Sequence, residues 1–321
     1  MSGLNNTMDC SVAPATTSSD AGIAGTGILL AFIMTATLAL LLSSYIVVSE
    51  AFMASSPRTI SRKLLSGLSD QQPVQGIAIQ ALGIARIHDL VAYHFFIIWM
   101  LSLLSTATNF AALLALVQDF KRDWMLRWLR QAAMFVSLCL TIVFGVFILE
   151  VNLKSLPSTL PVGCIWEDYA KEPEEKGNNP LAVAGIIAVI ASSTILFILG
   201  TWYLHLRKQV WGRFVQVLSL LVLFATAIAA TTRVVVISQA FGTPSVQLSD
   251  ENEKTWTFGQ LLAMLMLVLP FISALEISRG ELRVPSCEPE QIETDQVPLT
   301  SSGRTAVNHN RYSYQPNPFF K

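Results

Sequence analysis

The stretch DQQPVQGIAIQALGIARIHDLVAYHFFIIWMLSLLSTATNFAALLALV, residues 70–117, decides the fold of this chain. It contains two apolar runs, residues 73–87 and 90–117, which are separated only by His88 and Asp89. A helix needs about 20 apolar residues to cross the hydrocarbon core of a bilayer. The second run is long enough and the first is marginal, so the first run determines the topology of everything that follows it.

The composition indicates an integral membrane protein. Of the 321 residues, 52% are hydrophobic and 13% are charged, and the mean hydropathy is +0.52. Soluble domains are about 25% charged, so the deficit indicates that much of the surface faces lipid. The net charge of -1 argues against a nucleic-acid partner, which would require a basic face. The lipid bilayer is therefore the expected partner.

The apolar runs predict an all-α membrane domain over residues 23–278 with seven transmembrane helices. The predicted helices cover residues 25–48, 73–87, 90–117, 131–150, 181–204, 214–240 and 257–277. Pro73 would occupy the first turn of its helix, where the missing N–H matters least. Polar composition predicts disorder in residues 1–22 and in the tail, residues 279–321.

The positions of Lys and Arg favour seven crossings and set the orientation. If residues 73–87 cross, the connections on one face carry twelve basic residues and those on the other face carry four. The positive-inside rule then places the N-terminus outside and the C-terminus in the cytosol. If they do not cross, the loops 49–72 and 118–130 fall on opposite faces and the asymmetry disappears. We therefore predict a multi-pass protein of the plasma membrane or another secretory-pathway membrane, with the basic loops 118–130 and 205–213 open to a cytosolic partner.

This orientation gives three outer residues a possible role. Cys10 and Cys164 lie on outer segments in an oxidising compartment and could form a disulfide bond; the alternative is two free thiols. Asn5 begins an Asn-Asn-Thr glycosylation sequon. Cys139, in the middle of a predicted helix, is expected to pack in the core as a small residue.

Six ionisable residues are predicted to gather near the outer face. They are Arg86, His88, Asp89, His94, Glu150 and Arg233. Arg233 is the clearest case, because an Arg at the centre of a span costs about 2.5–3.5 kcal/mol to insert. The six residues could line a ligand or ion vestibule that opens outward. Alternatively, they snorkel to lipid headgroups around one structural pair, such as Arg233 with Glu150 or Asp89.

No motif in the sequence predicts an enzyme. There is no Walker A loop, no G-x-S-x-G turn, no H-E-x-x-H helix and no Cys/His cluster with metal-ligand spacing. His88 and His94 do not have the spacing of four that aligns two metal ligands on a helix. We therefore expect no catalytic activity, no cofactor and no metal site.

Two motifs are similar to those of a known family. The run Asp70-Gln-Gln-Pro-Val-Gln-Gly-Ile-Ala-Ile79 and the triplet Tyr93-His-Phe95, followed by Ser/Thr-rich residues 102–108, resemble uncharacterised integral membrane proteins of filamentous ascomycete fungi. The resemblance covers residues 25–280, and Pro73 and Gln75 depart from the Leu-Val-Thr stretch that is usual there. It implies a seven-helix membrane protein. Some relatives are associated with secondary-metabolite gene clusters, including those for perylenequinone pigments.

Two functions remain open. The first is a seven-helix surface protein with a receptor-like layout. It lacks receptor signatures, because Gln118-Asp-Phe-Lys-Arg122 replaces Asp-Arg-Tyr and Leu269-Pro270 replaces Asn-Pro-x-x-Tyr, so the likeness to G-protein-coupled receptors is one of topology only. The second is an accessory membrane protein or transporter for a fungal polyketide pigment. A neighbouring polyketide synthase gene would favour the second function.

Overall fold

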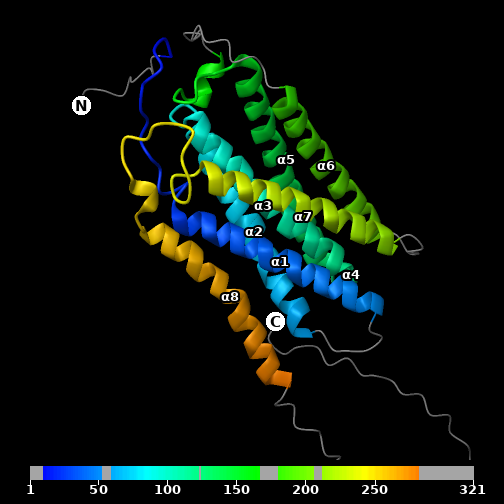
Figure 1. Ribbon diagram of the computed structural model, residues 1–321. Helices are drawn as coiled ribbons and strands as arrows, with labels where there is room; N and C mark the ends of the chain where they lie inside the picture. Colours follow the sequence, from blue (N-terminus) through cyan, green and yellow to red (C-terminus); the bar gives the residue numbers. More distant parts are fainter. Residues whose placement is uncertain (1–9, 53–58, 123, 167–179, 206–211, 282–321) are drawn as a thin grey trace, which may run out of the picture. The chain divides into compact units, whose positions relative to one another are not determined.

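The computed structural model describes residues 10–52, 59–122, 124–166, 180–205 and 212–281 (Figure 1). Within these residues the chain forms seven long α-helices and no strand, only two isolated β-bridges. The long helices are α1 (Thr26–Phe52), α2 (Thr59–Ala85), α3 (Ala92–Ala115), α5 (Trp124–Lys154), α6 (Pro180–His205), α7 (Gly212–Ile237) and α8 (Phe258–Glu281). The shorter elements are α4 (Val117–Arg122) and two 3₁₀ turns, η1 (Val162–Trp166) and η2 (Asn252–Lys254). The absence of strands among the described residues confirms the all-α part of the predicted fold class.

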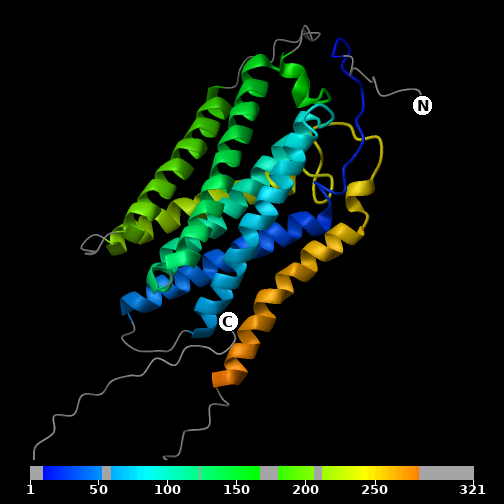
Figure 2. The same cartoon turned by 180° about the vertical axis from the view of Figure 1, so that it is seen from behind.

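Helix α3 is the centre of the bundle (Figures 1 and 2). Every residue of α3 except Phe96 is buried, and the helix contacts α1, α2, α5, α6 and α7. A helix that is apolar on all sides is stable only when other elements cover it. The second apolar run of the opening stretch is therefore the core around which the other helices pack.

Six helices are long and apolar enough to cross a membrane, namely α1, α3, α5, α6, α7 and α8. The outer faces of α6 and α8 expose large aliphatic side chains, among them Ile198, Leu265 and Leu275. Soluble proteins rarely expose continuous apolar faces, so these faces belong against lipid. The chain is an integral membrane protein with several spans.

Helix α2 differs most from its prediction. It begins at Thr59, well before residue 73, and Pro73 lies inside the helix rather than in its first turn. The predicted loop 49–72 is thus largely helical. The first half of α2 was missed because it is amphipathic: Leu65 and Leu68 are fully buried, while the charged residues Arg62, Lys63 and Asp70 flank them on partly or fully exposed positions. Pro73 is tolerated there because neighbouring helices support the interrupted hydrogen-bond ladder.

Two glutamines of α2 face the interior of the bundle. Gln72 and Gln80 are fully buried. Gln80 Nε2 donates to Thr141 Oγ1 of α5 at 2.9 Å, and the carbonyl of Gln72 accepts a hydrogen bond from Ser105 Oγ of α3 at 2.8 Å. This polar content explains why α2, although 27 residues long, is not among the six apolar helices.

Helix α5 begins earlier than predicted. It starts at Trp124 rather than at residue 131, and α4 precedes it, so the predicted basic loop 118–130 is helical where the structure describes it. Salt bridges and packing against α2 and α4 stabilise these residues as helix. A hydropathy profile does not detect such contacts. Cys139 is exposed on α5, not buried as expected. Of the second basic loop, residues 206–211 lie outside the described residues.

The helices share two ends, which we name after their bonds. The disulfide end contains the Cys10–Cys164 bond, η1, η2 and the starts of α1, α3, α6 and α8. The ion-pair end contains Arg62 and Arg130 with their acidic partners, together with the starts of α2, α5 and α7. Exposed Trp side chains lie near both ends, as in an aromatic belt at each membrane interface. They are Trp166 and Trp256 at the disulfide end and Trp124, Trp128 and Trp202 at the ion-pair end.

The segment before α1 is ordered from residue 10, which corrects the prediction of disorder over residues 1–22. Thr17 forms a β-bridge with Leu248 of the connection between α7 and α8. The Ser19 N–H donates to Asp250 Oδ1 at 3.0 Å. Composition does not predict this order, because it comes from bonds to residues far away in the chain. The sequon at Asn5 and the tail beyond residue 281 lie outside the described residues.

Candidate functional site

A buried carboxylate organises the disulfide end. The turn η2 directs Glu253 into the bundle, where none of its surface is exposed. Its Oε1 lies 2.9 Å from His94 Nε2, and its Oε2 accepts a hydrogen bond from the Tyr93 hydroxyl at 3.0 Å. The Tyr93 oxygen in turn accepts the Gln239 N–H at 3.1 Å. Every polar group at the centre of this cluster therefore has a partner, as buried polar groups require.

The Glu253 cluster joins four parts of the chain. His94 and Tyr93 begin α3, Gln239 follows α7, and the carbonyl of Glu253 accepts a hydrogen bond from Thr26 Oγ1 at the start of α1. Glu253 and His94 are buried and bonded to one another in this cluster, so we assign it a structural role. Of the predicted site residues, His94 is thus part of a structural cluster rather than of an open vestibule.

Glu253 was not among the six site residues predicted from the sequence. A signal was present, because the Tyr-His pair at residues 93–94 opens the most buried helix and needs a polar partner. Four carboxylates and amides, residues 250–253, could have supplied that partner, and nothing local distinguishes Glu253 from Glu251, whose side chain is exposed.

The disulfide bond closes the same end. The structure joins Cys10 and Cys164, with their Cα atoms 5.8 Å apart and both residues buried. Turn η1 is fixed in turn by two backbone hydrogen bonds of 3.0 Å, from Val162 N–H to the Leu90 carbonyl and from Gly163 N–H to the Ile87 carbonyl. The N-terminal segment and the connection after α5 thereby cover the turn between α2 and α3.

The other predicted site residues do not form one vestibule. Arg86 binds Asp20 of the N-terminal segment in a salt bridge, while His88 and Asp89 are exposed in the turn between α2 and α3. Glu150 lies 3.6 Å from Lys154, its neighbour one turn along α5. These contacts lie at separate places on the surface of the disulfide end.

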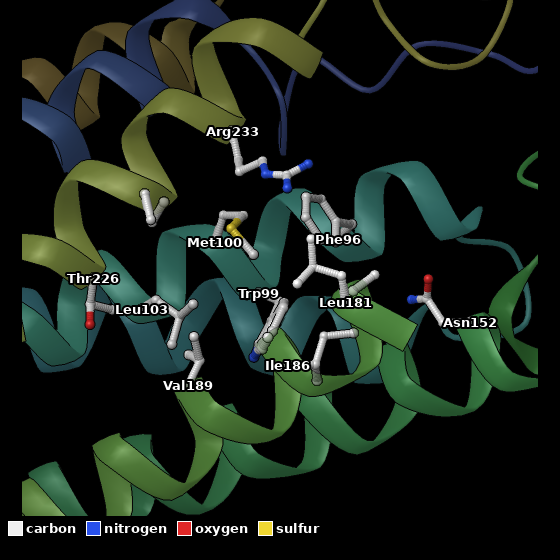
Figure 3. A pocket seen from close by; sticks show the side chains of 14 residues that line it. Phe96, Trp99, Met100, Leu103, Asn152, Leu181, Ile186, Val189, Thr226 and Arg233 are labelled. Atoms are coloured by element: carbon white, nitrogen blue, oxygen red, sulfur yellow. The ribbon is translucent and has the colours of Figure 1, made fainter. Parts of the chain in front are cut away.

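An apolar groove lies between α6 and α7, with α3 as its floor (Figure 3). Its volume is about 340 Å³. Its apolar lining comes from Phe96, Trp99, Met100, Leu103, Leu181, Ala182, Gly185, Ile186, Val189, Ala229 and Ala230. Three polar residues complete it, Asn152 of α5 and Thr226 and Arg233 of α7. The groove is the best candidate for a ligand site, because it combines apolar walls with a few polar groups.

Arg233 is the only charged residue among those that line the groove. It is exposed, and within the described residues it forms neither an ion pair nor a hydrogen bond. Figure 3 shows its guanidinium reaching from α7 over the groove toward Phe96, on the side where Leu181 begins α6. Neither expected partner, Glu150 or Asp89, pairs with it. Its counter-charge, if it has one, must come from outside the described part of the chain.

Comparison with protein-family models, with curated proteins and with solved structures finds no match for this chain. Among the described residues, no group of three or more His, Cys, Asp or Glu side chains could hold a metal ion. The groove and its arginine therefore have to be interpreted from their own chemistry.

Proposed function

We propose that this chain is a non-enzymatic seven-span membrane protein, receptor-like in layout, that binds a ligand in the groove between α6 and α7. The observation that carries the proposal is the groove itself. It holds one unpaired cation within an apolar wall, and such a combination of shape and charge is typical of a binding site.

The order of the helices supports seven crossings. Thr26 and His94 both contact Glu253, so α1 and α3 begin at the same end of the bundle. Helix α1 leads away from that end, and α2 must return to it before α3 can start. With 27 residues, α2 is about 40 Å long, enough to cross the hydrocarbon core. Its polar residues face α3 and α5, so lipid does not contact them.

The orientation rests on two independent features. The Cys10–Cys164 bond favours an oxidising compartment, which supports a disulfide end outside the cytosol. The basic residues gather in the connections at the ion-pair end, where the positive-inside rule expects the cytosol. The open end of the groove, at Arg233 and Leu181, then lies in the outer half of the membrane.

Epitope tags at the two termini test this layout. In intact protoplasts, an outside antibody should bind an N-terminal tag without permeabilisation and a C-terminal tag only after it. Asn5→Gln serves as an internal check, because loss of the sequon should remove a glycan if the N-terminus is outside. A shielded N-terminal tag together with an exposed C-terminal tag would invert the proposal.

A second function shares the same groove. Phe96 and Trp99 lie edge to face with their ring centroids 6.0 Å apart, and both line the groove. Aromatic walls of this kind favour a planar aromatic ligand, which fits an accessory protein or transporter for a polyketide pigment. Deletion of the gene separates the two functions: a changed metabolite profile supports the second, and an unchanged profile with a lost response to an external ligand supports the first.

A further inference from the structure

We propose that the ligand of the groove is a single-chain anionic amphiphile that enters sideways from the bilayer. Its carboxylate or phosphate headgroup would bind Arg233 and the first turn of α6, and its tail would lie between α6 and α7 over Trp99. This inference rests on the proposed function only in taking the groove as the binding site; it does not depend on which end of the bundle is outside.

The head of the groove is electropositive from two sources. The first is the Arg233 guanidinium, which can hold a carboxylate or phosphate with two parallel hydrogen bonds. The second is the start of α6 directly after Pro180, where the N–H groups of Leu181 and Ala182 have no helical acceptor. No acidic residue lies in that first turn to compensate it. Leu181, Ala182 and Arg233 all line the groove, so both sources act on the same space.

The body of the groove suits a hydrocarbon tail. From Leu181 to Val189 the α6 wall extends about 12 Å, and its side chains toward the groove are apolar. The small side chains of Ala229 and Ala230 leave space along the α7 wall. At Gly185 of α6, no atom lies within 4 Å of the position where a Cβ would lie. The volume of about 340 Å³ is at the lower end of ligand pockets, which range over about 300–1,000 Å³. One chain fits such a groove, and two chains do not.

Trp99 forms part of the floor of the groove, and 2% of its surface is exposed. Its Nε1 atom lies beside Gly145 of α5, 3.3 Å from the position where a Cβ on that glycine would lie. The polar edge of the indole therefore faces α5, and Trp99 contributes apolar ring surface to the floor under the tail.

The sideways route follows from the surroundings. The groove lies between two lipid-facing helices, and Leu181, Ile187 and Ile228 are exposed nearby. An amphiphile already dissolved in the bilayer can reach it without crossing the polar loops. An unpaired guanidinium is costly at hydrocarbon depth, so an anion from the bilayer stabilises the bound state.

Photo-crosslinking tests the proposal with the full chain in nanodiscs of neutral lipid. Three probes carry the same sixteen-carbon chain and a diazirine in the tail, but end in a carboxylate, a phosphate or an alcohol. We expect the two anionic probes to label α6 and α7, saturably and in competition with palmitate, and the alcohol to label about tenfold less. Inorganic phosphate should not compete; competition by it would show a site for free anions and overturn the proposal.

Two variants separate the head from the tail. Arg233→Gln should lower labelling by the anionic probes about tenfold and leave the alcohol unchanged, and Arg233→Lys should restore part of it. Gly185→Leu fills the groove and should abolish labelling by all three probes. Gly259→Leu is the matched control, because Gly259 on α8 also has no atom within 4 Å of a Cβ position and lies outside the groove.

The outcomes are read on variants that remain monodisperse and melt like the parent chain. Anionic labelling that survives both Arg233→Gln and Gly185→Leu would overturn the inference. If Arg233→Gln does not fold, the comparison of acid with alcohol on the parent chain still decides the question. Because labelling does not report orientation, its failure is distinguishable from an inverted result with the terminal tags.

Discussion

The two ends of the bundle are held by different kinds of interaction. At the disulfide end, Glu253 is completely buried against His94 and Tyr93, and Cys10 is bonded to Cys164. At the ion-pair end, charged side chains meet at a wet surface: Arg130 binds Asp70 at 2.6 Å, but nearly half of the Asp70 side chain remains exposed. Arg62 likewise bridges Glu50 and Asp119, and Asp119 is half exposed.

From this difference between the two ends we infer which end of the bundle is rigid. A buried charge cluster is intolerant, because removal of one member leaves the others without solvent or partner. Exposed salt bridges are screened and can be replaced by water at little cost. The disulfide end is therefore a fixed frame for the head of the groove, while the ion-pair end is free to rearrange. A receptor-like protein would need this arrangement, with ligand binding near the fixed end and response at the looser end.

The largest effect is expected from Glu253→Ala. The change leaves His94 and the Tyr93 hydroxyl buried without their acceptor, so it should destabilise the fold by about 3–5 kcal/mol. Thermal unfolding and the yield of monodisperse protein would measure the loss. Glu251→Ala is the matched control, since the Glu251 side chain is 75% exposed and binds only Lys254 within the described residues. Equal behaviour of the two variants would show that the buried cluster does not hold the disulfide end.

A smaller effect is expected from removal of the disulfide bond. Replacing Cys10 and Cys164 by Ser should cost about 2–4 kcal/mol, because the bond closes a loop between positions 154 residues apart. The reductant dithiothreitol should lower the melting temperature of the parent chain and not of the double variant. Cys139→Ser, at an exposed position, is the control. Non-reducing mass mapping is the direct check. If it finds the thiols of Cys10 and Cys164 free, the disulfide bond does not distinguish the two ends.

At the ion-pair end, a double-mutant cycle on Arg130 and Asp70 should give a coupling below about 1 kcal/mol. Arg130→Met loses the salt bridge and the hydrogen bond to Ser66, but water can reach the groups left behind. The cycle consists of Arg130→Met, Asp70→Asn and the double variant, each measured by thermal unfolding. A coupling as large as that of a buried pair would make the two ends alike and contradict the comparison.

The smallest effect concerns acid sensitivity at the disulfide end. Ser19, whose hydroxyl lies beside Asp250 and whose N–H donates to Asp250 Oδ1 at 3.0 Å, lowers the pKa of Asp250 below its ordinary value of 3.8. Because the folded pKa is the lower one, the stabilisation is present above pH 3.8 and is lost as the pH falls through the folded value. Asp250→Asn should therefore flatten the stability curve below about pH 4 and change little near neutral pH. Asp89→Asn, on the exposed turn, serves as the comparison, and the same flattening in both variants would refute the assignment.

Much of the fold was predictable because lipid imposes a strong rule on sequence. Long apolar runs favour membrane helices, so α1, α3, α6 and α7 were found to within a few residues. The two outer cysteines were paired for lack of any competing thiol on that side. The start of α2 was missed because an amphipathic helix has no continuous apolar run.

The ionisable residues show the limit of this rule. The positions of Arg233, Glu150 and His94 along their predicted helices placed them near one end of the bundle. Position along a helix does not determine which way a side chain points. In the structure His94 faces inward to Glu253, Glu150 stays with Lys154 on its own helix, and Arg233 faces the groove.

The sequence by itself determined that this chain is all-helical, with several helices long and apolar enough to cross a membrane, because hydropathy is a property of each segment. Only the tertiary structure decided that Glu253 rather than Glu251 is buried and that α6 and α7 leave a groove above Trp99. Those features depend on the rotation of helices against one another and on contacts between distant residues. The physical reason is that burial and pairing belong to the packed assembly, and no local run of sequence contains them.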